Sequence, residues 1–284
     1  MEMIRMKDSY RTRQKIENII SSILKILIIA VFVFPFLWML SISLQTEKEV
    51  NTFPATLIPA VPQFINYVKA WNRAPFLMYL KNSVLMTASI IILQIVIMVP
   101  AAYSFAKNEF RGKKLLFGLV LVAFMTPMQV TFIPLYYMFA DWGLLRTLWP
   151  QILPFLADAF GIFLLRQYFM QIPDELIEAA RLDNASEAKI IFKLMLPIAK
   201  PALSTSVLFS FISHWNDYFW PMVVTTIDEV RPLTVGIAAL KDTEGLAQWN
   251  VIFAGNMFLI APILIVYIFC SKYIIRAFAY NGVK

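Results

Sequence analysis

Six long apolar blocks constrain the fold of this chain more than any other feature of its sequence. A helix needs about 20 apolar residues to cross the hydrocarbon core of a bilayer, where each backbone polar group needs a partner within the protein. Of the 284 residues, 60% are hydrophobic and only 15% are charged, so a soluble fold would expose too much apolar surface. We therefore predict an all-α integral membrane protein with six transmembrane helices, at about 26–44, 84–106, 115–140, 148–165, 202–224 and 251–275.

The polar segments between these blocks define the expected organisation. No small-residue cleavage site follows the basic N-terminus, so we do not expect a removed signal peptide. Pro127 and Pro134 are expected to kink the third helix. The predicted order is a cytoplasmic N-terminal segment at 1–25, a first transmembrane helix at 26–44, an outer loop at 45–75, a core of five helices at 76–275 and a cytoplasmic tail at 276–284.

Basic residues are distributed unevenly between the two sides that six crossings create. Eighteen of the 25 Lys and Arg residues fall on the side of the two termini. The positive-inside rule therefore places both termini in the cytoplasm of a multi-pass cell-membrane protein. Five tryptophans fall on or near the opposite side, as in an outer aromatic belt: Trp71, Trp142, Trp149, Trp220 and Trp249. The net charge of +7 thus indicates membrane topology, with lipid as a partner, and not nucleic-acid binding.

One polar, amphipathic stretch, residues 178–197, is enclosed between apolar blocks and reads EAARLDNASEAKIIFKLMLP. A helix start precedes it at Pro173-Asp174-Glu175, and the pair Asp183-Asn184 predicts a turn. After Gly, Asn is the residue that most readily adopts the left-handed conformation. We expect a short helix, a sharp turn and a second helix on a cytoplasmic loop at 166–200. The second helix is expected to direct one face inward and to end at Pro197; that face carries Ala188, Ile191, Phe192 and Met195. An amphipathic hairpin on the membrane surface is the alternative.

This stretch resembles the EAA loop of ABC-importer permeases, in which E-A-A is followed by D-G-A and later by F and L-P. The matching residues are Glu178, Ala179, Ala180, Asp183, Ala185, Phe192, Leu196 and Pro197. Asn184 stands where the family has Gly. The resemblance implies a type I ABC importer permease fold, in which this coupling loop, including Arg181 and Asn184, docks on a cytoplasmic ATPase.

Further runs resemble the carbohydrate-uptake branch of these permeases, in particular the maltose-type second permease. They include Leu196-Pro197-x-x-x-Pro201, the run 215–221 and the C-terminal residues 280–284. The resemblance implies a second, different permease chain, two ATPase subunits that bind ATP and Mg, and an extracytoplasmic solute-binding protein. The polar loop at 225–250 is expected to contact that binding protein. The chain lacks a Gly-x-x-x-x-Gly-Lys phosphate loop, so we do not expect it to bind ATP in that way. As a transport subunit, the chain is expected to hold no cofactor and to catalyse no reaction.

Polar residues inside the predicted helices are the candidates for a substrate site or gate. They are Asp158 in the fourth helix and the run His214, Trp215, Asn216 and Asp217 in the fifth. Sugars offer both hydroxyls and apolar C–H faces, and this run combines hydrogen-bonding groups with aromatic rings. The alternative is that Asn216 and Asp217 bond to neighbouring helices or cap a broken helix. Gln94, Gln129 and Asn256 are expected to form contacts between helices.

Three other functions remain open at this point. One is an ABC permease for another polyol or for a phosphate-bearing solute such as glycerol phosphate. An anionic solute would need a central Lys or Arg, and none is evident in the predicted helices. An ion-coupled secondary transporter would use Asp158 and Asp217. A membrane enzyme or sensor would need a catalytic or metal cluster, which the only histidine, His214, and the only cysteine, Cys270, disfavour; we expect no metal site.

Overall fold

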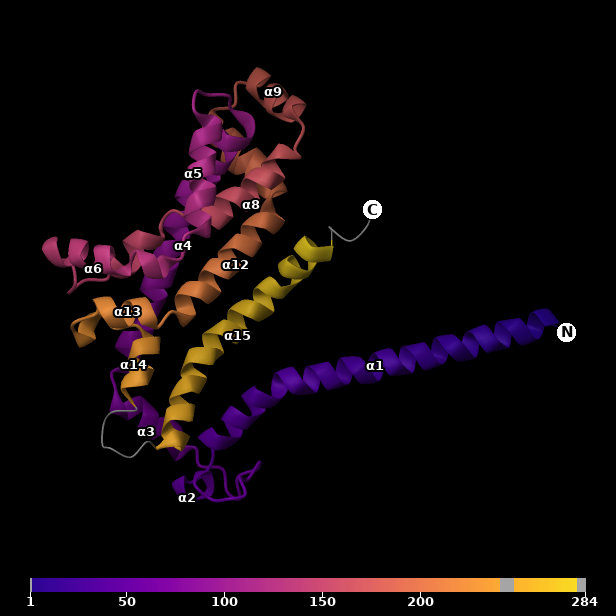
Figure 1. Ribbon diagram of the computed structural model, residues 1–284, viewed down its shortest axis with the longest axis vertical. Coiled ribbons are helices and arrows are strands. Elements are labelled where there is room, and N and C mark those ends of the chain that lie inside the picture. Colours follow the sequence, from indigo (N-terminus) through magenta and orange to yellow (C-terminus); the bar gives the residue numbers. More distant parts are fainter. Residues whose placement is uncertain (1, 241–247, 280–284) are drawn as a thin grey trace. The chain divides into compact units, whose positions relative to one another are not determined.

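The computed structural model describes residues 2–240 and 248–279, which form only helices, turns and connecting segments (Figure 1). The chain divides into two compact units. The first comprises residues 1–73 and 244–257, and the second comprises residues 74–243 and 258–284.

The first unit begins with one helix of 42 residues, α1, from Glu2 to Ser43. The expected border between a polar segment and a membrane helix at residue 25 is therefore not a structural break. The chain stays helical because neither Gly nor Pro occurs before Pro35. The part of α1 that is long and apolar enough to cross a membrane is Gln14–Ser43.

The segment after α1, which was expected as the outer loop, contains two helices, α2 (Glu47–Val50) and α3 (Ile65–Arg73). Thr46 and Glu49 form a reciprocal capping box at the start of α2. The buried Asn66 side chain donates hydrogen bonds to the carbonyl oxygens of Ser43 and Gln45, at 3.0 and 2.8 Å. Buried amide bonds of this kind give the expected outer loop a defined structure.

The second unit is built around α4 (Phe76–Lys107), which starts eight residues before the expected second membrane helix. Three other helices pack with α4 into a bundle: α5 (Lys113–Met125), α8 (Ala159–Met170) and α12 (Lys200–Asn216) (Figure 1). Fully buried side chains in its core include Met98, Tyr103, Leu165, Phe169 and Met195.

The third apolar block, expected as one kinked helix over 115–140, is broken. Helix α5 ends at Met125, a 3-10 turn η1 covers Met128–Val130, and α6 covers Phe132–Asp141. The break follows from Pro127, which has no N–H to donate and forces the preceding residue out of the helical region. Thr126 accordingly has φ −81° and ψ 119°.

The fourth block forms α7 (Trp149–Ile152), a 3-10 turn η2 (Leu153–Phe155) and α8. Helix α8 runs five residues past the expected end at Leu165, because no Gly or Pro interrupts it before Pro173. The predicted loop 166–200 is therefore shorter than expected, and its first residues, Arg166 to Met170, belong to α8.

After α12 the chain forms α13 (Phe219–Val224), a 3-10 turn η4 (Asp228–Val230), α14 (Leu233–Ala239) and α15 (Trp249–Ala279). Part of the expected polar loop at 225–250 is thus a helix, with Leu233 and Ile237 buried. The Ser83 hydroxyl of α4 accepts the backbone N–H of Leu233 at 2.7 Å. The remainder of that loop, 241–247, and the C-terminal run 280–284 lie outside the described residues, and the expected tail begins within α15.

Among the described residues, four helical stretches are long and apolar enough to cross a membrane: Gln14–Ser43, Phe76–Lys107, Trp149–Met170 and Trp249–Phe269. A fifth results if Glu187–Ile198 and Lys200–Asn216, which meet at 85°, form one broken span. The predicted six continuous helices are therefore not all present. The third block is interrupted at Pro127, and the fifth, expected over 202–224, is divided between α12 (Lys200–Asn216) and a second helix at Phe219–Val224.

Candidate coupling loop and polar helix junction

The stretch singled out in the sequence forms four short helical pieces: α9 (Asp174–Leu182), α10 (Glu187–Lys189), a π-helix η3 (Ile190–Met195) and α11 (Leu196–Ile198). Figure 1 shows α9 at the end of the bundle opposite α13 and α14. The expected helix, turn and second helix are all present, and Ile177 joins α9 to the buried core.

The turn after α9 depends on Asn184. Its φ of 55° is the only positive φ of a non-glycine residue in the described part of the chain. The N–H of Asn184 donates to the Arg181 carbonyl, and the N–H of Ala185 donates to the Ala180 carbonyl, both at 3.0 Å. These two bonds define a Schellman motif with Asn184 at the left-handed position. Ser186 then caps α10, so the direction of the chain after the turn is set by hydrogen bonds.

The inward face of the second helix differs from the expected one. Ile190 and Met195 are buried, whereas Phe192 is 41% exposed and Ala188 is exposed. The reason is the π-helix, whose i→i+5 bonding brings residues five apart onto one face. Pro197 does not end the helix as predicted. The chain remains helical to Ile198 and bends at Ala199, which has φ −84° and ψ 13°.

Most of the predicted coupling residues lie on the surface of this loop. Ala180 and Ala185 are half-buried against the core, and the exposed residues are Glu178, Ala179, Arg181, Asp183, Asn184, Phe192 and Pro197. Leu182 is 84% exposed.

Arg181 makes its ion pair across the turn. Its Nη2 lies 2.9 Å from Oε1 of Glu187, and not next to Glu178 on the same helix. This hydrogen-bonded carboxylate raises the pKa of Arg181 above its ordinary value. Glu178 forms no hydrogen bond or ion pair with any described residue, so the side chain is free to act outside the loop.

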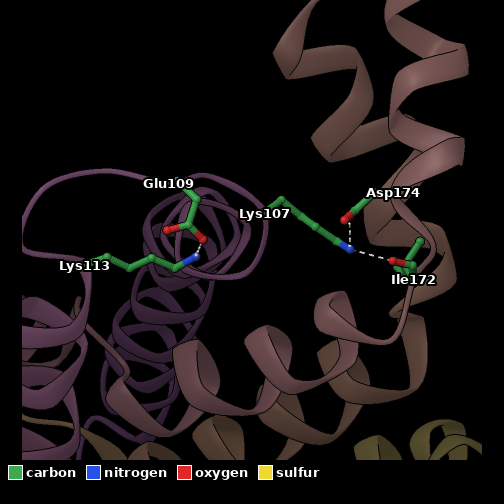
Figure 2. A network of polar contacts seen from close by, with 5 residues as sticks. All are labelled: Lys107, Glu109, Lys113, Ile172 and Asp174. Carbon is green, nitrogen blue, oxygen red and sulfur yellow. Dashed lines mark hydrogen bonds and ion pairs between the residues drawn. The ribbon is translucent and has the colours of Figure 1, made fainter.

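Two residues of α4 hold this loop, and sequence reasoning did not identify either. The Tyr103 hydroxyl donates to Oε2 of Glu187 at 3.0 Å. The Lys107 ammonium donates to the Ile172 carbonyl at 2.5 Å and to Oδ1 of Asp174 at 2.6 Å (Figure 2). The sequence feature that could have identified Tyr103 and Lys107 is their spacing, since they lie four residues apart at the end of an apolar helix.

The polar residues inside the bundle form a junction of three helices. Asp158 precedes α8 and accepts a hydrogen bond from the Ser206 hydroxyl of α12 at 3.0 Å. Gly161 makes room for this contact, because a Cβ atom there would lie 2.5 Å from both Asp158 Oδ2 and Ser206 Oγ. The same Cβ would lie 2.6 Å from the sulfur of Met98 on α4.

Gln94 forms the contact between helices that was expected of it. The buried amide accepts the Ser210 hydroxyl at 2.6 Å and donates to the Phe155 carbonyl at 2.7 Å. It therefore links α4 to α12 and to the turn before α8. Gln129 instead lines an open cavity of about 630 Å³ together with Phe132, Ile133, Tyr136, Tyr137, Phe219 and Val223.

The predicted run 214–217 lies at the break between α12 and α13. His214 is buried, with its ring centroid 4.5 Å from that of Phe155, and Trp215 donates to the Leu259 carbonyl at 3.1 Å. Asn216 bonds back to the Ile212 carbonyl at 2.8 Å. The carboxyl group of Asp217 accepts backbone N–H bonds from the first turn of α13. Asn216 and Asp217 thus have the helix-capping contacts given as the alternative.

The sequence of this chain is similar to those of known transport proteins. Residues 98–280 match the family described as binding-protein-dependent transport system inner membrane component. The chain is 31% identical to the arabinooligosaccharides transport system permease protein AraQ of Halalkalibacterium halodurans, over 89% of this chain and 91% of the relative. It is 32% identical to the sn-glycerol-3-phosphate transport system permease protein UgpE of Salmonella typhi, over 88% and 92%.

A solved structure is similar along almost the whole chain. It is a chain of a bacterial ABC transporter involved in the import of the acidic polysaccharide alginate. The TM-score is 0.81 at 28% identity, and the match covers 92% of this chain and 97% of the other.

Proposed function

Because this chain belongs to the family of binding-protein-dependent transport system inner membrane components, we propose that it is the permease subunit of an ATP-driven importer for a sugar or oligosaccharide. It is a multi-pass membrane protein of a transport family, and ATP hydrolysis would reside in partner subunits. The observation that carries the proposal is the loop from α9 to α11. It combines a rigid turn at Asn184 with exposed Glu178 and Leu182 within the segment that matches the family.

The proposed chain crosses the membrane six times, with both termini in the cytoplasm. The contact of Lys107 with Asp174 supports this count, because it brings the segments after α4 and after α8 to one end of the bundle. The chain must then leave and return between them. Helices α5 and α6 would provide the outward crossing despite the break at Pro127, and α7 with α8 the return. Most Lys and Arg residues fall on the side of this end, in line with a cytoplasmic location.

The proposed complex contains a second, different permease, two ATPase subunits with bound ATP and Mg, and an extracytoplasmic solute-binding protein. ATP binding would close the ATPases, and the coupling loop would carry their movement into the bundle. The bundle would then alternate between inward-open and outward-open states, which requires contacts that differ between the two states. The present chain would supply coupling and part of the passage, without making or breaking a covalent bond.

A sugar is favoured over glycerol phosphate by the cavity between α6 and α13. Its lining offers one amide, two phenol groups and aromatic faces, from Gln129, Tyr136, Tyr137, Phe132 and Phe219. A phosphate group would require a cation, and the described residues of the lining include no Lys or Arg. The relatives carry the names of both solute classes, so the cavity chemistry is the basis for this choice.

An uptake assay tests the proposal. The complete complex is reconstituted in proteoliposomes with ATP inside, and uptake of labelled arabinooligosaccharide is compared with that of glycerol 3-phosphate. We expect uptake of the sugar that depends on ATP and on the binding protein. Uptake of glycerol 3-phosphate alone would favour the alternative solute. Uptake driven by a proton or sodium gradient without ATP would instead identify a secondary transporter.

A further inference from the structure

We infer that Tyr103 and Lys107 of α4 clamp the coupling loop at both ends of α9, so that α9 and α4 move as one body. This inference rests on the proposed coupling function and assigns a positioning role to two residues outside the loop. One turn of helix separates the two side chains, so they lie on one face of α4. They meet the loop at two points, one at the start of α9 and one after its last turn.

The first attachment holds the start of α9. The Lys107 side chain is only 7% exposed, while that of Asp174 is 74% exposed. Its ammonium group bonds to the Ile172 carbonyl, just after α8, and to Asp174, the first residue of α9. A buried ammonium without its partners is costly, so this contact resists separation of α9 from α4. Figure 2 shows Lys107 reaching both acceptors.

The second attachment holds the end of α9 through a chain of three groups. Arg181, in the last turn, donates to Oε1 of Glu187, and the buried Tyr103 hydroxyl donates to Oε2 of the same carboxylate. The Arg181–Glu187 pair is about half exposed and would contribute little alone. Tyr103 is 1% exposed, so it anchors the pair to the bundle.

Through the clamp, a movement of the loop can reach the bundle without passing along the backbone that links α9 to α8 and α11 to α12. Along the backbone, α9 joins α8 through Ile172 and Pro173, and α11 joins α12 through the bend at Ala199. By contrast, α4 is a single helix, and its Gln94 bonds to α12. A displacement of α9 would therefore reach the junction of α4 and α12 along one continuous helix, which contains Pro100 between Tyr103 and Gln94.

The test uses the full complex in proteoliposomes and compares sugar transported per ATP hydrolysed. The variants are Lys107→Met and Tyr103→Phe, and the matched control is Lys113→Met, which removes a lysine paired with Glu109 within the neighbouring turn (Figure 2). We expect both clamp variants to retain the ATPase subunits. The transport ratio should fall about tenfold for both Tyr103→Phe and Lys107→Met, because each variant removes a hydrogen bond to a carboxylate. Lys113→Met should leave the ratio unchanged, and Lys107→Arg should restore most of it.

A distance measurement keeps the inference testable if a variant does not assemble. Spin labels at Leu176 on α9 and Val96 on α4, both exposed positions, are introduced with Cys270→Ser. In the otherwise unaltered complex, ATP with vanadate should leave the distance between the labels unchanged. A nucleotide-dependent change in that distance, or unchanged transport ratios in both clamp variants, would overturn the clamp. Failure of the unaltered complex to transport sugar with ATP would contradict the proposed function instead.

Discussion

Arg181 binds Glu187 across the turn that follows α9, with 2.9 Å between Nη2 and Oε1, although Glu178 lies only three residues away on the same helix. This pairing leaves the exposed Glu178 carboxylate with no role within the described loop. An acidic residue at position 178 could stabilise the helix by pairing with Arg181, or it could act outside the loop. The first explanation is not supported, because no Glu178–Arg181 pair is observed.

Glu178→Gln should therefore leave the permease folded and disrupt coupling. The thermal unfolding midpoint of the purified complex should stay the same, since an exposed pair on a helix contributes only about 0.2–0.5 kcal/mol even when formed. Uptake should fall more than the ATP hydrolysis that the binding protein stimulates. Glu175→Gln, an exposed acid in the first turn of the same helix, is the control. Full transport by Glu178→Gln would show that this carboxylate does not contact the ATPase.

Asn184 provides a test of the turn itself. Asn184→Gly should preserve transport, because Gly adopts a φ of 55° without strain. Asn184→Val should lose association with the ATPase, since a β-branched residue in the left-handed region costs about 1–3 kcal/mol. Co-purification of the ATPase measures this effect. Ala188→Val, at an exposed helical position after the turn, controls for the β-branched side chain. Equal co-purification of all three variants would contradict a required left-handed turn.

Gly161 should be essential for packing of the helix junction. Gly161→Ala would place a methyl group 2.5 Å from Asp158 Oδ2 and Ser206 Oγ, so α8 and α12 would have to separate. We expect a loss of about 1–3 kcal/mol in stability, as for other overpacked cores. Gly118→Ala is the matched control, because a Cβ there meets nothing within 4 Å. Thermal unfolding in detergent compares them, and equal midpoints would contradict close packing at Gly161.

Cysteine labelling tests the proposed orientation. In a Cys270→Ser background, Asn108→Cys and Asn184→Cys should react with a membrane-impermeant maleimide only from the cytoplasmic side. Asn51→Cys, exposed in the outer segment, should react only from outside. Thr243, another suitable outer position by sequence, lies outside the described residues. Labelling of Asn51 and Asn184 from the same side would be incompatible with six crossings.

The segment at 46–60 should loosen at acidic pH. The Glu49 carboxylate accepts bonds from the backbone N–H groups of Thr46 and Ala60, which lower its pKa below the ordinary 4.5. Because the folded pKa is lowered, the stabilisation is complete above 4.5 and is lost as the pH falls through the lowered pKa. Limited proteolysis at 46–60 should therefore rise at low pH. Glu49→Gln should be cleaved at a rate that no longer depends on pH in this range.

The sequence was sufficient to predict the structure where local sterics and hydrophobicity decide the conformation. The turn at Asp183-Asn184 was predictable because Asn tolerates positive φ and few other residues do. The apolar blocks were predictable as membrane helices because lipid leaves the backbone no other way to satisfy its polar groups. At Pro127 a kink was predicted, and the helix is broken there instead. The apolar pattern of the sequence does not show whether neighbouring helices can compensate for the lost hydrogen bond.

Contacts between distant residues were decided only by the tertiary structure. Nothing in the sequence distinguishes Glu178 from Glu187 as the partner of Arg181, because both lie within reach of a flexible side chain. The attachment of Lys107 to Asp174 and of Tyr103 to Glu187 joins positions 67 and 84 residues apart. Likewise, Asp158 and Asp217 appear equally exceptional as acids in apolar blocks, and only the fold assigns one to Ser206 and the other to the start of α13. The physical reason is that hydrogen bonds of side chains depend on which helices pack together, and packing is a property of the whole bundle.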